Sequence, residues 1–332
     1  MNMNLLESIL TAYGATGREG CVREVIEKAL TGHVDSLTTD VMGNLIAVKK
    51  GDGTGRRIML SAHMDHIGLM VMDADKHGYI RVCNVGGIRP ANMVAQHVVF
   101  ENGAVGVVGA DEGVKGALEM RHLYIDVGAE SREEALAIAP IGEVAVAAPR
   151  IARLGANRIA SPAMDDRIAC YIQAQALLEL PETIKNDVIA VFSVQEEVGL
   201  RGATTAAYAA DPDMGIALDV TGVGDVPGHK DHLPMALGKG AAVKIMDRSL
   251  ICTPAVVDLM LACAQEEGIA HQREVLSFGG TDAGAIQKTR GGVPSGAISI
   301  PCRYIHSGAE TVDLRDVKAC IDLTKAFMEH SA

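Results

Sequence analysis

The stretch Asn186-Asp187-Val188-Ile189-Ala190-Val191-Phe192-Ser193-Val194-Gln195-Glu196-Glu197-Val198-Gly199 decides the fold of this chain. Between residues 188 and 194 every position except Ser193 is apolar, and most of these residues are β-branched or aromatic. Such a run predicts a strand that is buried on both faces, as in a parallel sheet. The strand ends in two adjacent carboxylates, and ligands of open α/β sheets bind at the carboxyl ends of strands. Neighbouring side chains of an extended segment point opposite ways, so one acid can bind a metal while the other faces a substrate.

Helical and strand-like segments alternate on both sides of this stretch. We expect helices at 5–13, 18–30, 167–180, 203–210, 254–268, 282–288 and 312–330, and strands at 34–39, 44–49, 57–62, 214–218, 271–276 and 293–300. Between them, residues 68–160 form short β-type runs separated by glycine turns, with one helix at 131–137 capped by Ser131. That texture predicts a small β-barrel or sandwich-like module. The simplest architecture is one α/β domain made of residues 1–67 and 161–332 and interrupted by this module.

The composition excludes several functional classes. The 332-residue chain is 48% hydrophobic and carries a net charge of −12 without a basic cluster, which argues against nucleic acid and anionic membranes as partners. No positive charge precedes Arg18, and no apolar run approaches the length of a membrane span, so we expect neither a signal peptide nor a transmembrane helix. The seven cysteines are widely spaced and form no Cys-x-x-Cys pair. They predict reduced thiols and a cytoplasmic protein.

Five places in the chain carry residues of the kind that bind metals, and four of them follow predicted strands. They are His63 with Asp65, Asp165 with Asp166, Glu196 with Glu197, Asp219, and His306. Taken singly, each has a structural explanation as a capping acid, a turn residue or a core histidine. Because the carboxyl ends of parallel strands meet at one edge of a sheet, the set as a whole predicts a single site.

Charge counting favours two metal ions in that site. Asp165, Glu197 and Asp219 supply three negative charges and a bridging hydroxide supplies a fourth, which two divalent ions balance, with His63 and His306 as neutral ligands. Imidazole combined with carboxylate suits zinc first, and also cobalt or manganese. Two such ions, about 3.5–4 Å apart, can share one carboxylate and one hydroxide.

That division leaves two acids for other work. Glu196 is then free to act as the general base. Asp65, two residues beyond His63, can hold the second ring nitrogen of that imidazole. The residues alone do not separate Asp165 from its neighbour Asp166 as the shared carboxylate.

The order of these blocks resembles the M42 family of dinuclear metallo-aminopeptidases, which includes glutamyl, deblocking and tetrahedral aminopeptidases. The resemblance runs essentially end to end. Its blocks are His63-Met64-Asp65, Asp165-Asp166-Arg167, Gln195-Glu196-Glu197-Val198-Gly199-Leu200-Arg201-Gly202-Ala203, Leu218-Asp219-Val220-Thr221, Phe278-Gly279-Gly280-Thr281-Asp282-Ala283-Gly284 and Arg303-Tyr304-Ile305-His306-Ser307.

The resemblance implies a zinc-peptidase-like mixed sheet flanked by helices, with an inserted PDZ-like β-barrel domain that serves assembly and access. It implies two divalent ions per subunit: His63 and Asp219 on one, Glu197 and His306 on the other, and Asp165 as the bridge. Glu196 would be the base, and Asp65 would be the partner that supports the metal ligand His63. The implied activity is removal of N-terminal residues from short peptides, by a metal-bridging hydroxide. The implied assembly is a dimer that builds a hollow dodecamer.

The chain departs from the family pattern at two places near proposed ligands. His66 stands where the family often has Glu, and Gly308-Ala309-Glu310 stands where it commonly has Pro-Val-Glu. From His66 we expect a preference for neutral aliphatic first residues. Two other functions compete with this one, a glucanase-like glycoside hydrolase and a non-catalytic peptide-binding scaffold. Adjacent Glu196 and Glu197 are an awkward pair for glycoside hydrolysis, since its two carboxylates must flank a bond at about 5–10 Å.

Overall fold

The opening stretch forms strand β12, Asp187–Ser193, near the middle of a large sheet. The computed structural model describes residues 1–229 and 233–330. Val188, Ala190 and Phe192 pack into the main core on one face of the sheet, and Ile189 and Val191 pack into a second core on the other face. The prediction of a strand buried on both faces is therefore confirmed.

The large sheet has 11 strands in the part of the chain that the structure describes, in the order β1-β2-β12-β3-β13-β16-β17-β11-β10, with β14 beside β16 and β15 beside β14. Its central strands β12, β3, β13 and β16 are mutually parallel, so their carboxyl ends lie at one edge. The strands are β1 Ser36–Thr39, β2 Leu45–Lys49, β3 Arg57–His63, β10 Ala152–Leu154, β11 Arg158–Ser161, β12 Asp187–Ser193, β13 Met214–Gly222, β14 Ala241–Met246, β15 His271–Val275, β16 Ser295–Arg303 and β17 Glu310–Asp313.

Helices cover both faces of this sheet, because each presents an apolar stripe to one of the two cores. One face carries α1 Met3–Thr11, α2 Gly20–Leu30, α5 Met164–Leu178, α7 Pro254–Glu266 and α9 Leu314–Glu329, and the other carries α6 Arg201–Ala210 and the short α8 Ala283–Ile286. This is the expected mixed α/β fold with helices on both faces.

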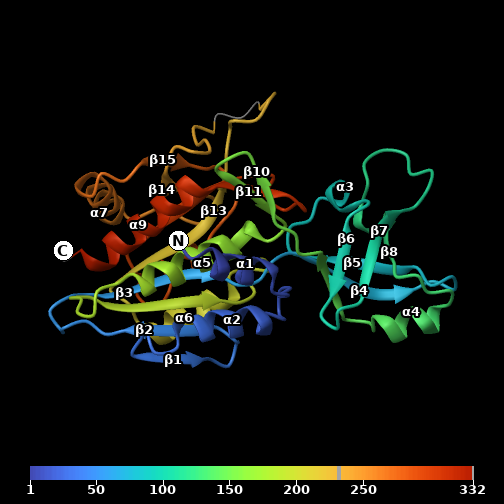
Figure 1. Cartoon of the computed structure of the whole chain (residues 1–332), viewed down its shortest axis with the longest axis horizontal. Coiled ribbons are helices and arrows are strands. Elements are labelled where there is room, and N and C mark those ends of the chain that lie inside the picture. Colours follow the sequence, from blue (N-terminus) through green and yellow to red (C-terminus); the bar gives the residue numbers. More distant parts are fainter. Residues whose placement is uncertain (230–232, 331–332) are drawn as a thin grey trace.

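A closed antiparallel barrel stands to one side of the sheet-and-helix part (Figure 1). Its strands close in the order β4-β5-β8-β7-β6-β9 around a separate apolar core. The barrel strands are β4 Gly68–Ala74, β5 Ile80–Val85, β6 His97–Phe100, β7 Val105–Ala110, β8 Leu123–Asp126 and β9 Val144–Ala147, and the helical segments near them are α3 Pro90–Met93, the 3₁₀ turn η1 Met120–His122 and α4 Arg132–Ile138. The expected inserted β-barrel is thus present.

The structure corrects several element boundaries. The predicted closing helix at 312–330 begins at Leu314, because Glu310–Asp313 forms strand β17, which pairs with β16 and β11. Strands β4, β10, β11 and β14 were not predicted, and long-range pairing rather than local pattern establishes them. No helix within the described ranges is both long enough and apolar enough to cross a bilayer.

Candidate active site and metal centre

The ends of four neighbouring strands deliver the predicted ligands to one place. His63 is the last residue of β3, and Glu196 and Glu197 follow β12 after a short turn. Asp219 lies in the second half of β13, and His306 follows β16. Strand β3 pairs with β12 on one side and β13 on the other, so His63 occupies the centre of the group.

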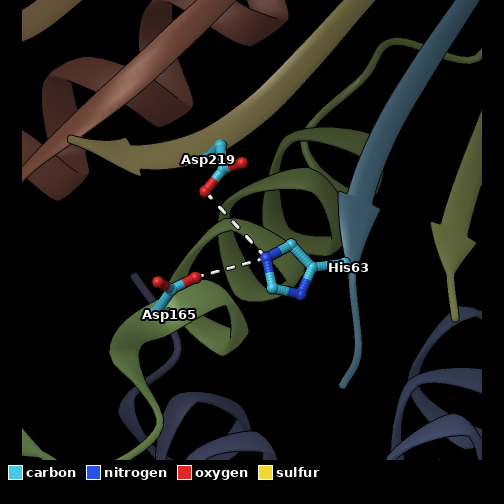
Figure 2. Close-up of side chains that lie close together, drawn as sticks. All are labelled: His63, Asp165 and Asp219. Atoms are coloured by element: carbon cyan, nitrogen blue, oxygen red, sulfur yellow. Dashed lines mark ion pairs between the residues drawn. The ribbon is translucent and has the colours of Figure 1, made fainter. Parts of the chain in front are cut away.

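Asp165 enters from the first turn of α5 and lies between the two histidines. Its Oδ1 is 3.2 Å from His63 Nε2, and its Oδ2 is 3.2 Å from His306 Nε2. His63 Nε2 is also 4.0 Å from Asp219 Oδ1, and Figure 2 shows both carboxylates directed at this nitrogen. On the other side, Glu197 Oε1 is 3.4 Å from His306 Nε2. Two adjoining groups of potential metal ligands therefore share the Asp165 carboxylate.

Asp166 belongs to neither group of potential metal ligands, although it is the next residue. Its Oδ2 accepts a hydrogen bond from the backbone N–H of His63 at 3.3 Å, and its side chain is fully buried. Burial raises the pKa of the Asp166 carboxyl well above its ordinary value. The backbone geometry thus separates two acids that the sequence left equivalent: only Asp165 faces both histidines.

The electrostatics of the cluster fit divalent cations. Burial raises the pKa of Asp219 well above its usual range, and the charge of Asp165 adds to this effect. Burial opposes protonation of His306, but its hydrogen bonds to Asp165 and Glu197 outweigh that effect and raise its pKa to about 11. Glu197 Oε1 is buried, and it lies 3.4 Å from His306 Nε2. So many buried acids around two imidazoles need positive charge, which protons or metal ions can supply, and the donor set is one that zinc, cobalt or manganese accepts.

Glu196 lies beside this group without belonging to either set of ligands. Its Oε2 is 3.9 Å from His63 Nε2. Burial, and next the charges of nearby acids such as Asp219, raise the pKa of Glu196 well above its ordinary value. A carboxylate with a raised pKa at the edge of a metal-type cluster is suited to proton transfer.

Asp65 supports the site, but mainly through backbone amides. Its carboxylate accepts hydrogen bonds from the N–H groups of Glu196 at 3.0 Å and Glu197 at 3.3 Å, and from the Thr16 hydroxyl at 2.8 Å. His63 Nδ1 lies 2.9 Å from the Asp65 carbonyl oxygen and 3.5 Å from its carboxylate. The ring nitrogen is therefore oriented chiefly by the Asp65 main chain, while the Asp65 side chain fixes the turn that carries the two glutamates.

Two buried acids near the cluster received no role in the sequence analysis. Glu310 accepts hydrogen bonds from the backbone N–H groups of both Asp165 and His306. Asp282 accepts hydrogen bonds from the hydroxyls of Ser61 and Ser193, and so links α8 to strands β3 and β12. The signal for Asp282 was its place in a matched sequence block, whereas Glu310 had only its closeness to His306.

The cluster opens into a cavity of about 730 Å³. Beyond the ligands, an apolar wall lines it, formed by Val223, Val226, Leu233, Leu276 and Phe278. Gly87 and Arg89 reach it from the barrel part. The described residues that line the cavity do not include His66. Its side chain is buried, and its backbone pairs with Ala15. His66 therefore does not touch the cavity directly, and the preference for neutral aliphatic first residues stays a prediction.

Comparisons with known proteins agree on one family. The model of the M42 glutamyl aminopeptidase family matches residues 43–323. A protein of Acetivibrio thermocellus named as a candidate aminopeptidase is 44% identical over 322 residues, which cover 96% of each chain. Lysyl aminopeptidase of Pyrococcus furiosus is 38% identical over 345 residues, covering 99% of this chain and 97% of the relative.

Solved structures show the same fold. An aminopeptidase from the archaeon Desulfurococcus kamchatkensis superposes with a TM-score of 0.94 at 39% identity, covering 98% of this chain and 94% of its own. The Pyrococcus horikoshii TET1 peptidase, described as assembling into a tetrahedron or a large octahedral shell, gives 0.87 at 32% identity and 98% coverage of both chains. A Thermotoga maritima protein described as an endoglucanase gives 0.82 at 29% identity, covering 98% of this chain and 96% of its own.

Proposed function

This chain belongs to the M42 peptidase family, and from that premise we propose how its residues divide the work of a dinuclear aminopeptidase. Metal-dependent aminopeptidase activity is the function that the family and the structural neighbours support. The observation that carries the dinuclear proposal is the position of Asp165, with one carboxylate oxygen 3.2 Å from each histidine.

We assign one metal to His63 and Asp219 and a second to Glu197 and His306, with Asp165 shared. These polar atoms lie 3.2–4.0 Å apart, and a small cation placed between them can replace their direct contacts. Zinc is our first choice, and cobalt or manganese would fit the same donors. When bound, two such ions polarise the scissile carbonyl and make water a better nucleophile.

Glu196 is the proposed general base. It takes a proton from the attacking water and returns it to the amine that leaves. The Asp65 carboxylate holds the backbone of Glu196 and Glu197, so it keeps the base and a ligand in fixed relation. This is the role in which we place Asp65.

The substrate class we propose is short peptides with a neutral apolar first residue. Five apolar side chains, those of Val223, Val226, Leu233, Leu276 and Phe278, line the cavity beyond the ligands. The cations Lys244 and Arg303, which also line the cavity, are neutralised: Lys244 Nζ is 2.7 Å from Glu274, and Arg303 makes two bonds of 2.7–2.8 Å to Asp225. Neither of these two cations is free to attract an acidic first residue; Arg89, the remaining arginine of the described lining, comes from the barrel part.

The endoglucanase description of one structural neighbour does not change this proposal. Glycoside hydrolysis needs two carboxylates that flank the glycosidic bond, with room for the sugar between them. Here Asp165 and Glu197 contact imidazoles at 3.2–3.4 Å, an arrangement that suits metal binding. The chain also contains no tryptophan, the residue that most often stacks on sugars. A non-catalytic scaffold has no use for this full set of ligands.

We also propose self-association, through dimers, into a dodecamer in which the barrel serves assembly and access. The P. horikoshii relative described as a tetrahedral or octahedral assembly supports this proposal. Exposed apolar residues on the barrel, including Val105, Val107 and Ile141, give it a surface to cover. A cytoplasmic location is consistent with the seven cysteines, which are all free thiols.

A chelation experiment with a substrate panel tests the function. Removal of metal should abolish release of N-terminal residues, and zinc, cobalt or manganese should restore it. Among aminoacyl chromophores, leucyl substrates should be cleaved faster than glutamyl ones, and peptides with a blocked N-terminus should resist. Full activity in protein that elemental analysis shows to be metal-free would contradict the proposal, as would cleavage of cellulose derivatives without peptide cleavage.

A further inference from the structure

We propose that Glu310 is a positioning residue for the second metal site, because its carboxylate fixes both the shared ligand Asp165 and the ligand His306 through their backbone amides. This inference rests on the proposed function. Glu310 belongs to neither group of potential metal ligands, so it acts through the residues it holds.

Each carboxylate oxygen of Glu310 binds one backbone amide. Its Oε2 accepts a hydrogen bond from the Asp165 N–H at 2.8 Å, and its Oε1 accepts one from the His306 N–H at 2.7 Å. The residue is 1% exposed. It begins strand β17 and pairs with Ser161 of β11, so its backbone is held by the sheet. One rigid carboxylate thus joins two segments that lie 141 positions apart in the sequence.

Both segments need such a partner. His306 has φ +60°, and Tyr304 two residues earlier has φ +62°, a left-handed conformation that costs energy for side chains other than glycine. Asp165 lies in the first turn of α5 with non-helical angles, where the amides have no partner within the helix. Without Glu310, both N–H groups would be buried without an acceptor, and the ligand loop would lose its fixed position.

Asp65 provides the same arrangement on the opposite side of the cluster. Its carboxylate accepts hydrogen bonds from the N–H groups of Glu196 and Glu197. The backbone of four site residues is thus held by two buried acids, each of which binds two amides. Asp65 fixes the backbone of Glu196 and Glu197, and Glu310 fixes the backbone of Asp165 and His306.

The test is metal binding by Glu310→Gln protein, measured by calorimetry on the stripped chain and by the absorption spectrum after cobalt loading. Glutamine keeps the size but replaces one acceptor oxygen by an NH₂ group, which faces an amide N–H. Supporting interactions of this kind typically contribute 10–100-fold in metal affinity. We therefore expect wild-type protein to bind two equivalents, and E310Q to bind the second about 10–100-fold more weakly, with an altered cobalt spectrum and partial recovery of turnover in excess metal.

Asp316→Asn is the matched control. Asp316 is a buried carboxylate on α9 that also accepts hydrogen bonds from two amides, those of Gly238 and Gly240, but it does not line the active-site cavity. D316N should lose stability while both metal affinities stay at the wild-type value. If E310Q behaves like D316N, with lower stability and unchanged metal affinity, Glu310 has only a structural role and the inference is wrong.

Two further outcomes are decisive. If E310Q does not fold, Glu310→Asp takes its place: its carboxylate lies about 1.5 Å further back and cannot reach both amides, so wild-type affinity in E310D overturns the inference. If stripped wild-type protein takes up no metal at all, the proposed function itself fails and this inference fails with it. If the Glu310 variant binds both metal ions as tightly as wild-type protein does, only the inference about Glu310 is wrong and the proposed function stands.

Discussion

Replacement of His66 by glutamine should reduce the loss of stability that the folded chain shows as the pH falls from 8 to 5. His66 is 4% exposed and lies near the buried guanidinium of Arg167. Burial, and next the charge of Arg167, lower the pKa of His66 from its ordinary 6.5 to about 3. The folded chain therefore keeps this imidazole neutral at pH values where the unfolded chain protonates it.

The sign and size of the effect follow from that difference. As the pH falls below 6.5, His66 binds a proton in the unfolded state but not in the folded state. The free energy of unfolding therefore decreases until about pH 3. At pH 8 the imidazole is neutral in both states and contributes nothing. At pH 5 the loss is about 2 kcal/mol, at 1.36 kcal/mol for each pH unit below the unfolded pKa.

Urea unfolding of wild-type and H66Q protein at pH 8 and pH 5 measures this effect. Wild-type protein should lose about 2 kcal/mol more than H66Q between the two conditions, because all other titrating groups are common to both chains. Substitution of His33, whose side chain is exposed, should leave the wild-type dependence in place. An identical loss of stability in H66Q and wild type would refute the reasoning, since it would mean that His66 is protonated in the folded chain.

Two further predictions concern the site and the assembly. Glu196→Gln should lower turnover roughly 10²–10⁴-fold and keep its metal, whereas Glu197→Gln should lose metal from the His306 site, so equal metal loss in both variants would contradict the division of roles. Light scattering should find a particle of roughly 418 kDa, the mass of twelve chains of 34.8 kDa, and a fully active particle of one chain mass would contradict the assembly proposal.

The sequence predicts the parts of the site that local pattern determines. An apolar run followed by two acids indicates β12 and the place of Glu196 and Glu197, because a buried strand must end where such residues begin. The same reasoning brings His63 and Asp219 to the edge of the sheet, where the structure places them next to each other. The parallel register of β12 and β3 places Ser193 opposite His63. The residues that follow β12 therefore pass close to that histidine.

What the sequence misses depends on backbone direction and on contacts between distant segments. Asp165 and Asp166 are the same residue type side by side, and only the non-helical turn at the start of α5 directs one of them into the cluster. Glu310 acts through two amides, and no side-chain pattern reveals an amide as a partner. His66 lies three residues after a ligand, yet the chain turns it into the interior, away from the cavity.

The position of the barrel brings it close to the proposed second metal site. The chain leaves the large sheet immediately after His63, forms the barrel, and returns through β10 and β11 to the turn that carries Asp165. The barrel segment at Gly86 and Gly87 then lies over the site: a side chain at Gly87 would begin 3.0 Å from the His306 ring, and one at Gly86 would begin 3.2 Å from Glu197. Glycine suits both positions, because a side chain at Gly87 would crowd His306, and Gly86 has φ +81° and would bring a side chain within 2.7 Å of Ile67. A shift of the barrel would therefore change the surroundings of His306 and Glu197, whereas the hydrogen bond from the His306 N–H to Glu310 ties His306 to the sheet.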